Sequence, residues 1–255
     1  PSWAPTRGNR RFDAALARVD GVVMRLVRRY RERPQEAPPL LALLMDAHDP
    51  DTGAPFTDSR LRDEVITLLL AGHETTASAL TWTFTFLSRH PDVERRVWTE
   101  VDAALHGRTP GPGDVAALRY TTQVLQESLR LAPPIWAIER RAVAADIIGD
   151  FGIPAGSSVI VSPYVLHRHP AFWSEPERFD PDRFAAAKSL EAYLPFGAGP
   201  RYCIGAEFAM LEARLVLAMV AQCWRLVAVP GQGVAPDAAL TLRVRGGWRA
   251  VLHRR

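Results

Sequence analysis

Apolar residues recur at helical spacing through most of the first half of the chain. The spacing predicts an arginine-rich amphipathic helix over about 10–31, a short apolar helix over 40–47, and helices over about 91–105 and 115–131. The longest predicted helix spans about 58–89, because this stretch contains one glycine and no proline, the residue that most strongly breaks helices. The first half is therefore predicted to be almost entirely helical.

The pattern changes after the adjacent prolines Pro133 and Pro134. Short β-prone pieces separated by glycine and proline turns run from 135 to 161 and predict a small sheet. An irregular stretch rich in proline and aromatic residues follows over 167–195. A helix is expected over 205–222, and the remainder alternates weakly, as strands do. The expected fold class is mainly α with a minor β-sheet (α+β).

The composition is that of a globular protein with a sizeable core. Of 255 residues, 47% are hydrophobic and 23% are charged, and the net charge of +3 is spread over interspersed basic and acidic residues. This gives no indication of nucleic-acid binding, and the dense basic run over 25–33 is interpreted as an exposed helix face. No apolar run reaches the roughly 18 residues that a membrane span needs, and no signal-peptide pattern opens the chain, so a cytoplasmic protein is expected.

The two cysteines of the chain are not expected to form a disulfide. Cys203 and Cys223 are twenty residues apart, and a helix over most of that interval would separate their sulfur atoms by roughly 30 Å. Cys223 ends an apolar stretch and precedes Trp224, so it is expected to be a buried core thiol.

Polar residues interrupt the apolar centre of the long predicted helix. The segment VITLLLAGHETTASAL (65–80) is apolar on every side before Gly72 and again after the threonines, so it is expected to be buried. A glycine and a carboxylate such as Glu74 cost stability there, which indicates a functional role; the alternative is a carboxylate paired with a nearby basic group. The zinc-protease pattern HExxH is excluded, because Ala77 stands where the second histidine would be.

Cys203 lies in a turn of unusual composition, FGAGPRYCIG (196–205). The dinucleotide pattern GxGxxG is excluded, because Tyr202 occupies its third glycine position and no strand precedes the turn. A cysteine just before a helix N-terminus is stabilised as a thiolate, which can serve as a nucleophile or a metal ligand. A nucleophile would need a distant histidine, for which His167 and His169 are candidates, whereas the glycines would let a flat group approach the backbone.

A third candidate is the pair Glu127 and Arg130 in LQESLRLAPP. Residues three apart on a helix are neighbours on its surface, so the pair taken alone is interpreted as a surface ion pair that contributes little to stability.

Taken together, three stretches resemble the cytochrome P450 haem-thiolate monooxygenases: AGHETT (71–76), ESLR (127–130) and FGAGPRYCIG (196–205). The last matches the family pattern FxxGxRxCxG at every fixed position. PDRF (181–184) resembles the family's PxRF element, and PERF (176–179) is a rival match at a less usual distance before the cysteine. The resemblance covers essentially the whole chain, including its opening PSWAPTRGNRR.

The resemblance implies the C-terminal, haem-binding portion of the cytochrome P450 fold, as one partial domain over 1–255. Its parts would be a long central helix (about 58–89), an ExxR helix (about 115–131), the haem-thiolate loop (196–205) and the following helix (205–222).

The same resemblance assigns Cys203 as the axial thiolate ligand of haem b. Two arginines would bind the haem propionates, an aromatic ring would pack against the loop, and two glycines would keep the face of the haem ring clear. These cofactor-binding residues are, in that order, Arg201 and Arg140, Phe196, and Gly199 and Gly205.

On the other side of the haem, Glu74 and Thr75 would be the acid–alcohol pair that supplies protons during oxygen activation. Gly72 would let the long helix open locally above the iron. A buried ion-pair triad, structural rather than catalytic, would support the thiolate loop: Glu127, Arg130 and Arg183.

The implied activity is the insertion of one oxygen atom of O2 into an apolar small-molecule substrate. The substrate would contact Ala71, Thr75 and the apolar turn 135–137. Electrons would come from a separate ferredoxin or flavodoxin, which would dock on a basic surface around Arg201 and Arg214.

Two alternatives to this activity remain open. One is a peroxide-using haem-thiolate enzyme, which the pair Glu74 and Thr75 disfavours because such an enzyme has little need of a relay for dioxygen. The other is a truncated, catalytically silent haem-binding fragment. The chain begins with Pro1 instead of methionine, and family members carry a large further portion before the matching region.

Overall fold

The structure, a computed structural model, describes residues 3–185 and 191–255. The first two residues of the opening PSWAPTRGNRR therefore lie outside the described residues. The chain forms two compact units, Pro1–His73 and Glu74–Arg255. The long helix α3, Asp58–Leu87, contributes its first part to one unit and its second part to the other.

The described part of the first unit is mainly helical, with one isolated β-bridge between His48 and Pro55. It contains α1 (Arg7–Glu32), the short η1 (Pro34–Glu36), α2 (Pro39–Met45) and the beginning of α3. Thr6 caps α1 by accepting a hydrogen bond from the Asn9 N–H, and the prolines that follow α1 prevent its continuation. The buried core of this unit consists of Val23, Val27 and Leu61, while the arginines of the basic run 25–33 are exposed or half-buried, as predicted.

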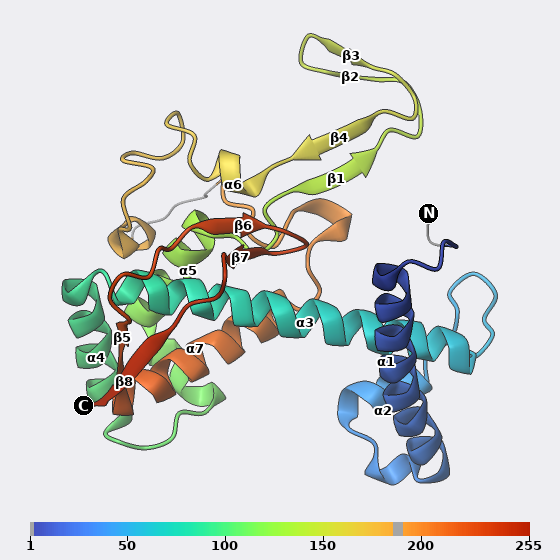
Figure 1. Ribbon diagram of the computed structural model, residues 1–255, viewed down its shortest axis with the longest axis horizontal. Helices are drawn as coiled ribbons and strands as arrows, with labels where there is room; N and C mark the ends of the chain where they lie inside the picture. Colours follow the sequence, from blue (N-terminus) through green and yellow to red (C-terminus); the bar gives the residue numbers. More distant parts are fainter. Residues whose placement is uncertain (1–2, 186–190) are drawn as a thin grey trace. The chain divides into compact units, whose positions relative to one another are not determined.

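Helices also dominate the second unit. Those besides α3 are α4 (Pro91–Leu105), α5 (Arg119–Leu131), α6 (Pro163–Leu166) and α7 (Ala206–Cys223), with the 3-10 turns η2 (Pro112–Ala117), η3 (Pro181–Phe184) and η4 (Gly199–Arg201). Figure 1 shows α4, α5 and α7 packed around the second part of α3. Their apolar faces meet in one core, which includes Leu87, Val97, Leu125 and Leu217.

The described residues of the second unit also form four antiparallel strand pairs (Figure 1). They are β1 (Ile138–Arg141) with β4 (Ser158–Val161), β2 (Asp146–Ile148) with β3 (Phe151–Ile153), β5 (Trp224–Ala228) with β8 (Ala250–Arg254), and β6 (Pro236–Ala238) with β7 (Leu242–Val244). Small two-stranded sheets beside a helical core confirm the predicted fold class, mainly α with minor β.

Two expectations about burial are wrong. The centre of α3 is not buried on every side, since Leu69 and Leu70 are 52% and 61% exposed. Cys223 is also exposed, because α7 ends there and the chain passes directly into the edge strand β5. As predicted, both cysteines are free thiols.

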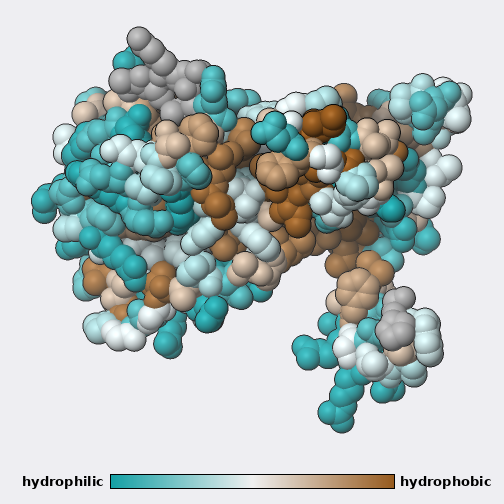
Figure 2. Space-filling model, turned by 90° about the horizontal axis from the view of Figure 1, so that it is seen from above, coloured by the Kyte–Doolittle hydropathy of each residue, from teal (hydrophilic) through white to brown (hydrophobic). Residues whose placement is uncertain are grey.

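Apolar surface is plentiful in the described chain. Figure 2 shows exposed hydrophobic side chains gathered in patches instead of being evenly scattered. No helix within residues 3–185 or 191–255 combines the length and the apolar character that crossing a bilayer requires.

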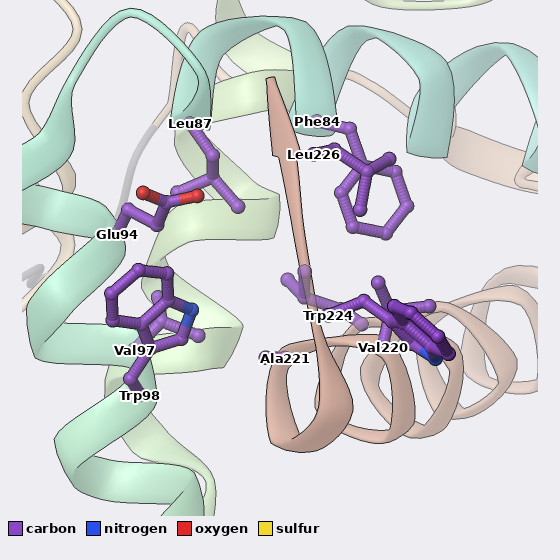
Figure 3. Close-up of a pocket in the computed structure, with 10 residues that line it drawn as sticks. Phe84, Leu87, Glu94, Val97, Trp98, Val220, Ala221, Trp224 and Leu226 are labelled. Carbon is purple, nitrogen blue, oxygen red and sulfur yellow. The ribbon is translucent and has the colours of Figure 1, made fainter. Parts of the chain in front are cut away.

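A small cavity of about 20 Å³ lies in the core where α4, α7 and β5 meet. Figure 3 shows the Glu94 carboxylate beside Leu87 and the indole of Trp98 in its otherwise apolar lining. Burial raises the pKa of Glu94 although the Arg225 Nε approaches its carboxylate at 3.1 Å. The cavity has room for no more than about one water molecule, so it is a packing void and not a substrate site.

Candidate functional site

The thiolate loop, residues 196–205, is a tight turn closed by its own backbone. The Cys203 N–H donates to the Phe196 carbonyl at 3.0 Å. Gly197 and Gly199 have φ angles of 75° and 69°, in the left-handed region that residues with a side chain enter only at a cost. The path of the backbone that presents Cys203 therefore requires glycine at both positions.

The Cys203 thiol is exposed immediately before α7, which begins at Ala206. The cysteine therefore precedes the unpaired N–H groups with which a helix begins. A Cβ atom added at Gly205 would lie 3.9 Å from the Cys203 Sγ, so the glycine keeps this side of the sulfur bare.

The surface next to Cys203 is open and apolar. Ile204 is 94% exposed and Phe208, in the first turn of α7, is 71% exposed. Within residues 3–185 and 191–255, no group of three or more His, Cys, Asp or Glu side chains could hold a metal ion by itself. A single cysteine sulfur beside open apolar surface suits a metal held in a flat macrocycle, and the loop therefore fits the haem that the sequence predicts.

The triad predicted beneath the loop is brought together in the structure. Glu127 Oε2 accepts from Arg130 Nε at 2.7 Å, and Glu127 Oε1 accepts from Arg183 Nε at 3.0 Å. The Glu127 and Arg130 side chains are both 0% exposed, so their interpretation as a surface ion pair is wrong. The reason lies outside α5: other segments cover the helix and complete the hydrogen bonds of both groups.

The remaining donors of Arg130 are satisfied by backbone carbonyls. Arg130 Nη1 donates to the carbonyls of His167 and Pro176, both at 2.7 Å. The rival arginine Arg178 contributes only its carbonyl, since its guanidinium pairs with Glu175 at the surface. Of the two PxRF-like matches, the one that contains Arg183 therefore reaches Glu127.

The sequence did not predict that His167 packs beside the triad of Glu127, Arg130 and Arg183. Its imidazole is fully buried, with Nε2 accepting from the Leu194 N–H at 2.8 Å and Nδ1 lying 3.1 Å from the Arg130 carbonyl. These contacts assign the neutral tautomer with the proton on Nδ1, and burial lowers the pKa of His167 to about 4. Both ring nitrogens are engaged by backbone groups, so His167 is not available as a base for Cys203.

The predicted acid–alcohol pair lies on the second part of α3. Glu74 and Thr75 are both half-buried, and consecutive side chains on a helix point about 100° apart. Glu74 Oε1 accepts a hydrogen bond of 2.7 Å from the hydroxyl of Thr241, which lies between β6 and β7. The partner is thus a hydroxyl group and not the basic group considered as the alternative, and Thr241 was not foreseen.

The two arginines predicted to bind propionates are both exposed. In the part of the chain that the structure describes, no acid pairs with Arg201, and Arg140 Nη1 donates only to the neighbouring Glu139 carbonyl at 2.9 Å. A Cβ atom at Gly197 would lie 3.7 Å from Ile138 Cδ1, so β1, which carries Arg140, packs against the thiolate loop. Both guanidinium groups are therefore available to an anionic ligand.

Comparison with known proteins identifies relatives along almost the entire chain. The profile of the cytochrome P450 family matches residues 1–243. Cyclooctatin synthase of Streptomyces melanosporofaciens is 43% identical over 243 residues, which make up 93% of this chain and 53% of that protein. Cyclooctat-9-en-7-ol 5-monooxygenase of the same organism is 44% identical over 231 residues, or 89% of this chain and 50% of that protein.

Solved structures give the same result. The heme domain of cytochrome P450DA matches with a TM-score of 0.88 and 33% identity, covering 98% of this chain and 56% of that one. A mutant of that heme domain matches with a TM-score of 0.90 and 32% identity, covering 100% of this chain and 57% of that one. The chain spans about half the length of the relatives it matches.

Proposed function

The chain belongs to the cytochrome P450 family, and we propose that it forms the haem-thiolate part of a monooxygenase that inserts one oxygen atom of O2 into an apolar substrate. The observation that carries this proposal is the exposed Cys203 on its glycine turn, before the N-terminus of α7. Family membership implies haem; that the haem is type b and that Cys203 is its ligand are parts of the proposal.

In this assignment the chain's own residues hold the cofactor at three places. Cys203 would supply a thiolate ligand to the iron, and Arg201 and Arg140 would bind the propionates by charge-assisted hydrogen bonds. Phe196 packs within the loop, where its ring contacts the ring of Tyr202 edge to face, with the two ring centroids 6.5 Å apart. Haem with a thiolate ligand supplies the electron-rich iron that favours O–O bond cleavage.

Proton supply is assigned to Glu74 and Thr75. The Thr75 hydroxyl would donate a hydrogen bond toward the reacting oxygen, and the Glu74 carboxylate would take up a proton and return it to the hydroxyl or to a water beside it. The position of Glu74 at the wall of an open pocket of about 490 Å³ supports this role, because water can reach the carboxylate there.

The substrate is proposed to be an apolar alicyclic compound. The names of two relatives state that they act on cyclooctat-9-en-7-ol and on pentalenene. In this chain the apolar turn Ile135, Trp136 and Ala137, together with Thr75 on α3, would contact such a substrate.

Electron delivery is assigned to a separate ferredoxin or flavodoxin. The exposed Arg201 supports a basic docking surface. Arg214, the other residue assigned to that surface, is half-buried, and its Nε atom has no hydrogen-bond partner among the described residues.

The test is the carbon monoxide spectrum of the reduced, haem-loaded protein. We expect the red-shifted Soret band of a thiolate ligand, its loss in Cys203→Ser, and its retention in the control Cys223→Ser, which alters the other exposed thiol. Persistence of the band in Cys203→Ser would refute the ligand. If this chain gives no band but the longest reading frame that contains it does, the chain alone is the catalytically silent fragment.

A further inference from the structure

The turn between β6 and β7 is fastened to one face of α3. Ser78 Oγ and Trp82 Nε1 both donate to the Leu242 carbonyl, at 2.7 and 3.0 Å. Glu74 precedes Ser78 by four residues, as Ser78 precedes Trp82, so the three side chains lie in one row along the helix. The row ends at Glu74, whose carboxylate accepts a hydrogen bond from the hydroxyl of Thr241, the residue before Leu242.

The Thr241 hydroxyl is held in a fixed position before it meets Glu74. Thr241 is 2% exposed, and the following Leu242 N–H donates to the Pro134 carbonyl at 2.8 Å. Leu242 is thus bound on both of its backbone groups, independently of Glu74. Removal of the Thr241 hydroxyl should therefore leave the turn in place.

Glu74 itself has no other anchor in the described part of the chain. Its carboxylate accepts one hydrogen bond, from Thr241, and forms no ion pair with a described residue. It faces the open pocket of about 490 Å³, whose lining also includes the polar Ser78, Asp237 and Arg243. A glutamate in such a place would otherwise exchange among several rotamers, and fixing it removes that freedom before the proton is needed.

We propose that Thr241 is a positioning residue, which holds the Glu74 carboxylate through its hydroxyl in the orientation from which Glu74 exchanges protons between the pocket and Thr75. This inference rests on the proposed function. Thr241 does not touch the reacting atoms; it acts through Glu74, with one carboxylate oxygen held and the other left to water.

Three variants of the complete haem-loaded enzyme test this role. Thr241→Val removes the hydroxyl and keeps the branched shape, and Thr241→Ser restores the hydroxyl. Thr85→Val is the matched control, because it removes a buried threonine hydroxyl of α3 that bonds only to the Thr81 carbonyl of the same helix. The products are the oxidised substrate and hydrogen peroxide, each measured per electron consumed.

We expect Thr241→Val to keep the thiolate-type carbon monoxide band, to lower product per electron by about three-fold or more and to raise peroxide in proportion, because Glu74 loses the hydrogen bond that fixes its carboxylate for proton transfer. Thr241→Ser should recover coupling to within about two-fold of the parent, and Thr85→Val should match the parent. Parental coupling in Thr241→Val, or no recovery in Thr241→Ser, overturns the inference.

A second readout does not depend on turnover. The infrared band of the Glu74 carboxylate, identified by its absence in Glu74→Gln, should shift in Thr241→Val and stay in place in Thr85→Val; an unmoved band in Thr241→Val overturns the inference. Failure of the proposed function gives a different result from failure of this inference. If the proposed function is wrong, the parent enzyme itself lacks the thiolate-type band, and the Thr241 variants have no bearing on that result.

Discussion

Replacement of the buried His167 should make the thiolate loop less stable and remove a specific dependence on pH. His167→Leu leaves two backbone groups without their partner, the buried Arg130 carbonyl and the half-buried Leu194 N–H. A buried group left without its partner costs ~1 to 3 kcal/mol and a half-buried one costs less, so the free energy of unfolding should fall by ~2 to 4 kcal/mol. His167→Gln can still bridge both groups with its amide and should lose less.

The pH dependence follows from the lowered pKa of His167. In the unfolded chain the imidazole takes up a proton near its ordinary pKa of 6.5, whereas in the folded protein burial holds the pKa at about 4. The unfolded state therefore binds more protons between these values, and stability is full above pH 6.5 and is lost as the pH falls toward 4. At about 1.4 kcal/mol for each pKa unit, the full loss attributable to His167, reached below pH 4, is roughly 3 to 4 kcal/mol.

The assay is urea unfolding of the haem-loaded protein between pH 7 and pH 4.5, followed by circular dichroism and by the thiolate-type carbon monoxide band. Carboxylates titrate over the lower part of this range too, so the quantity of interest is the difference between parent and His167→Gln. The control His253→Gln makes the same substitution at an exposed imidazole on β8. A His167→Gln protein that loses as much stability with falling pH as the parent would refute the assignment of His167 as a buried neutral donor and acceptor.

Three further outcomes are expected. Glu127→Gln removes the charge that binds Arg130 and Arg183, so it should cost ~3 to 5 kcal/mol and lower the haem-to-protein ratio; full haem content would contradict the triad's proposed role. Thr75→Ala should keep the carbon monoxide band and divert electrons to hydrogen peroxide, and an unchanged product yield per electron would exclude its role. Because burial raises the pKa of Glu94, its charge is unfavourable at neutral pH, so Glu94→Gln should gain stability relative to the parent as the pH rises from 4 to 7 in urea unfolding.

The features that the sequence predicted are those with a local cause. The long helix followed from a stretch without proline, and α3 does run from Asp58 to Leu87. The turn before α7 could be predicted from the sequence because it contains Gly197 and Gly199, and glycine is the residue that most readily adopts the left-handed backbone conformation found there. Periodicity, helix breakers and turn residues act over a few positions, so one sequence is enough to recognise them.

The features that the sequence could not predict depend on residues far apart in the chain. Glu127 and Arg130 look like an ordinary surface pair until the carbonyls of His167 and Pro176, some forty residues onward, close over the guanidinium. The Thr241 hydroxyl bonds to Glu74 across 167 positions, from a turn between β6 and β7 that has no distinguishing sequence pattern. No spacing rule reports such contacts, because tertiary packing alone brings the partners together.

The long-range contacts form a single path to the proposed iron ligand. The Arg130 guanidinium donates a hydrogen bond to the His167 carbonyl, and the Arg130 carbonyl accepts one from the His167 ring. The His167 ring in turn accepts a hydrogen bond from the Leu194 N–H. Leu194 lies two residues before Phe196, and the Phe196 carbonyl accepts a hydrogen bond from the Cys203 N–H. Each segment on this path is joined to the next by a hydrogen bond. A substitution in the triad should therefore disorder the thiolate loop at a lower denaturant concentration than the one that unfolds the helices. In a urea titration of Glu127→Gln, the thiolate-type band should therefore disappear at a lower urea concentration than the helical signal does.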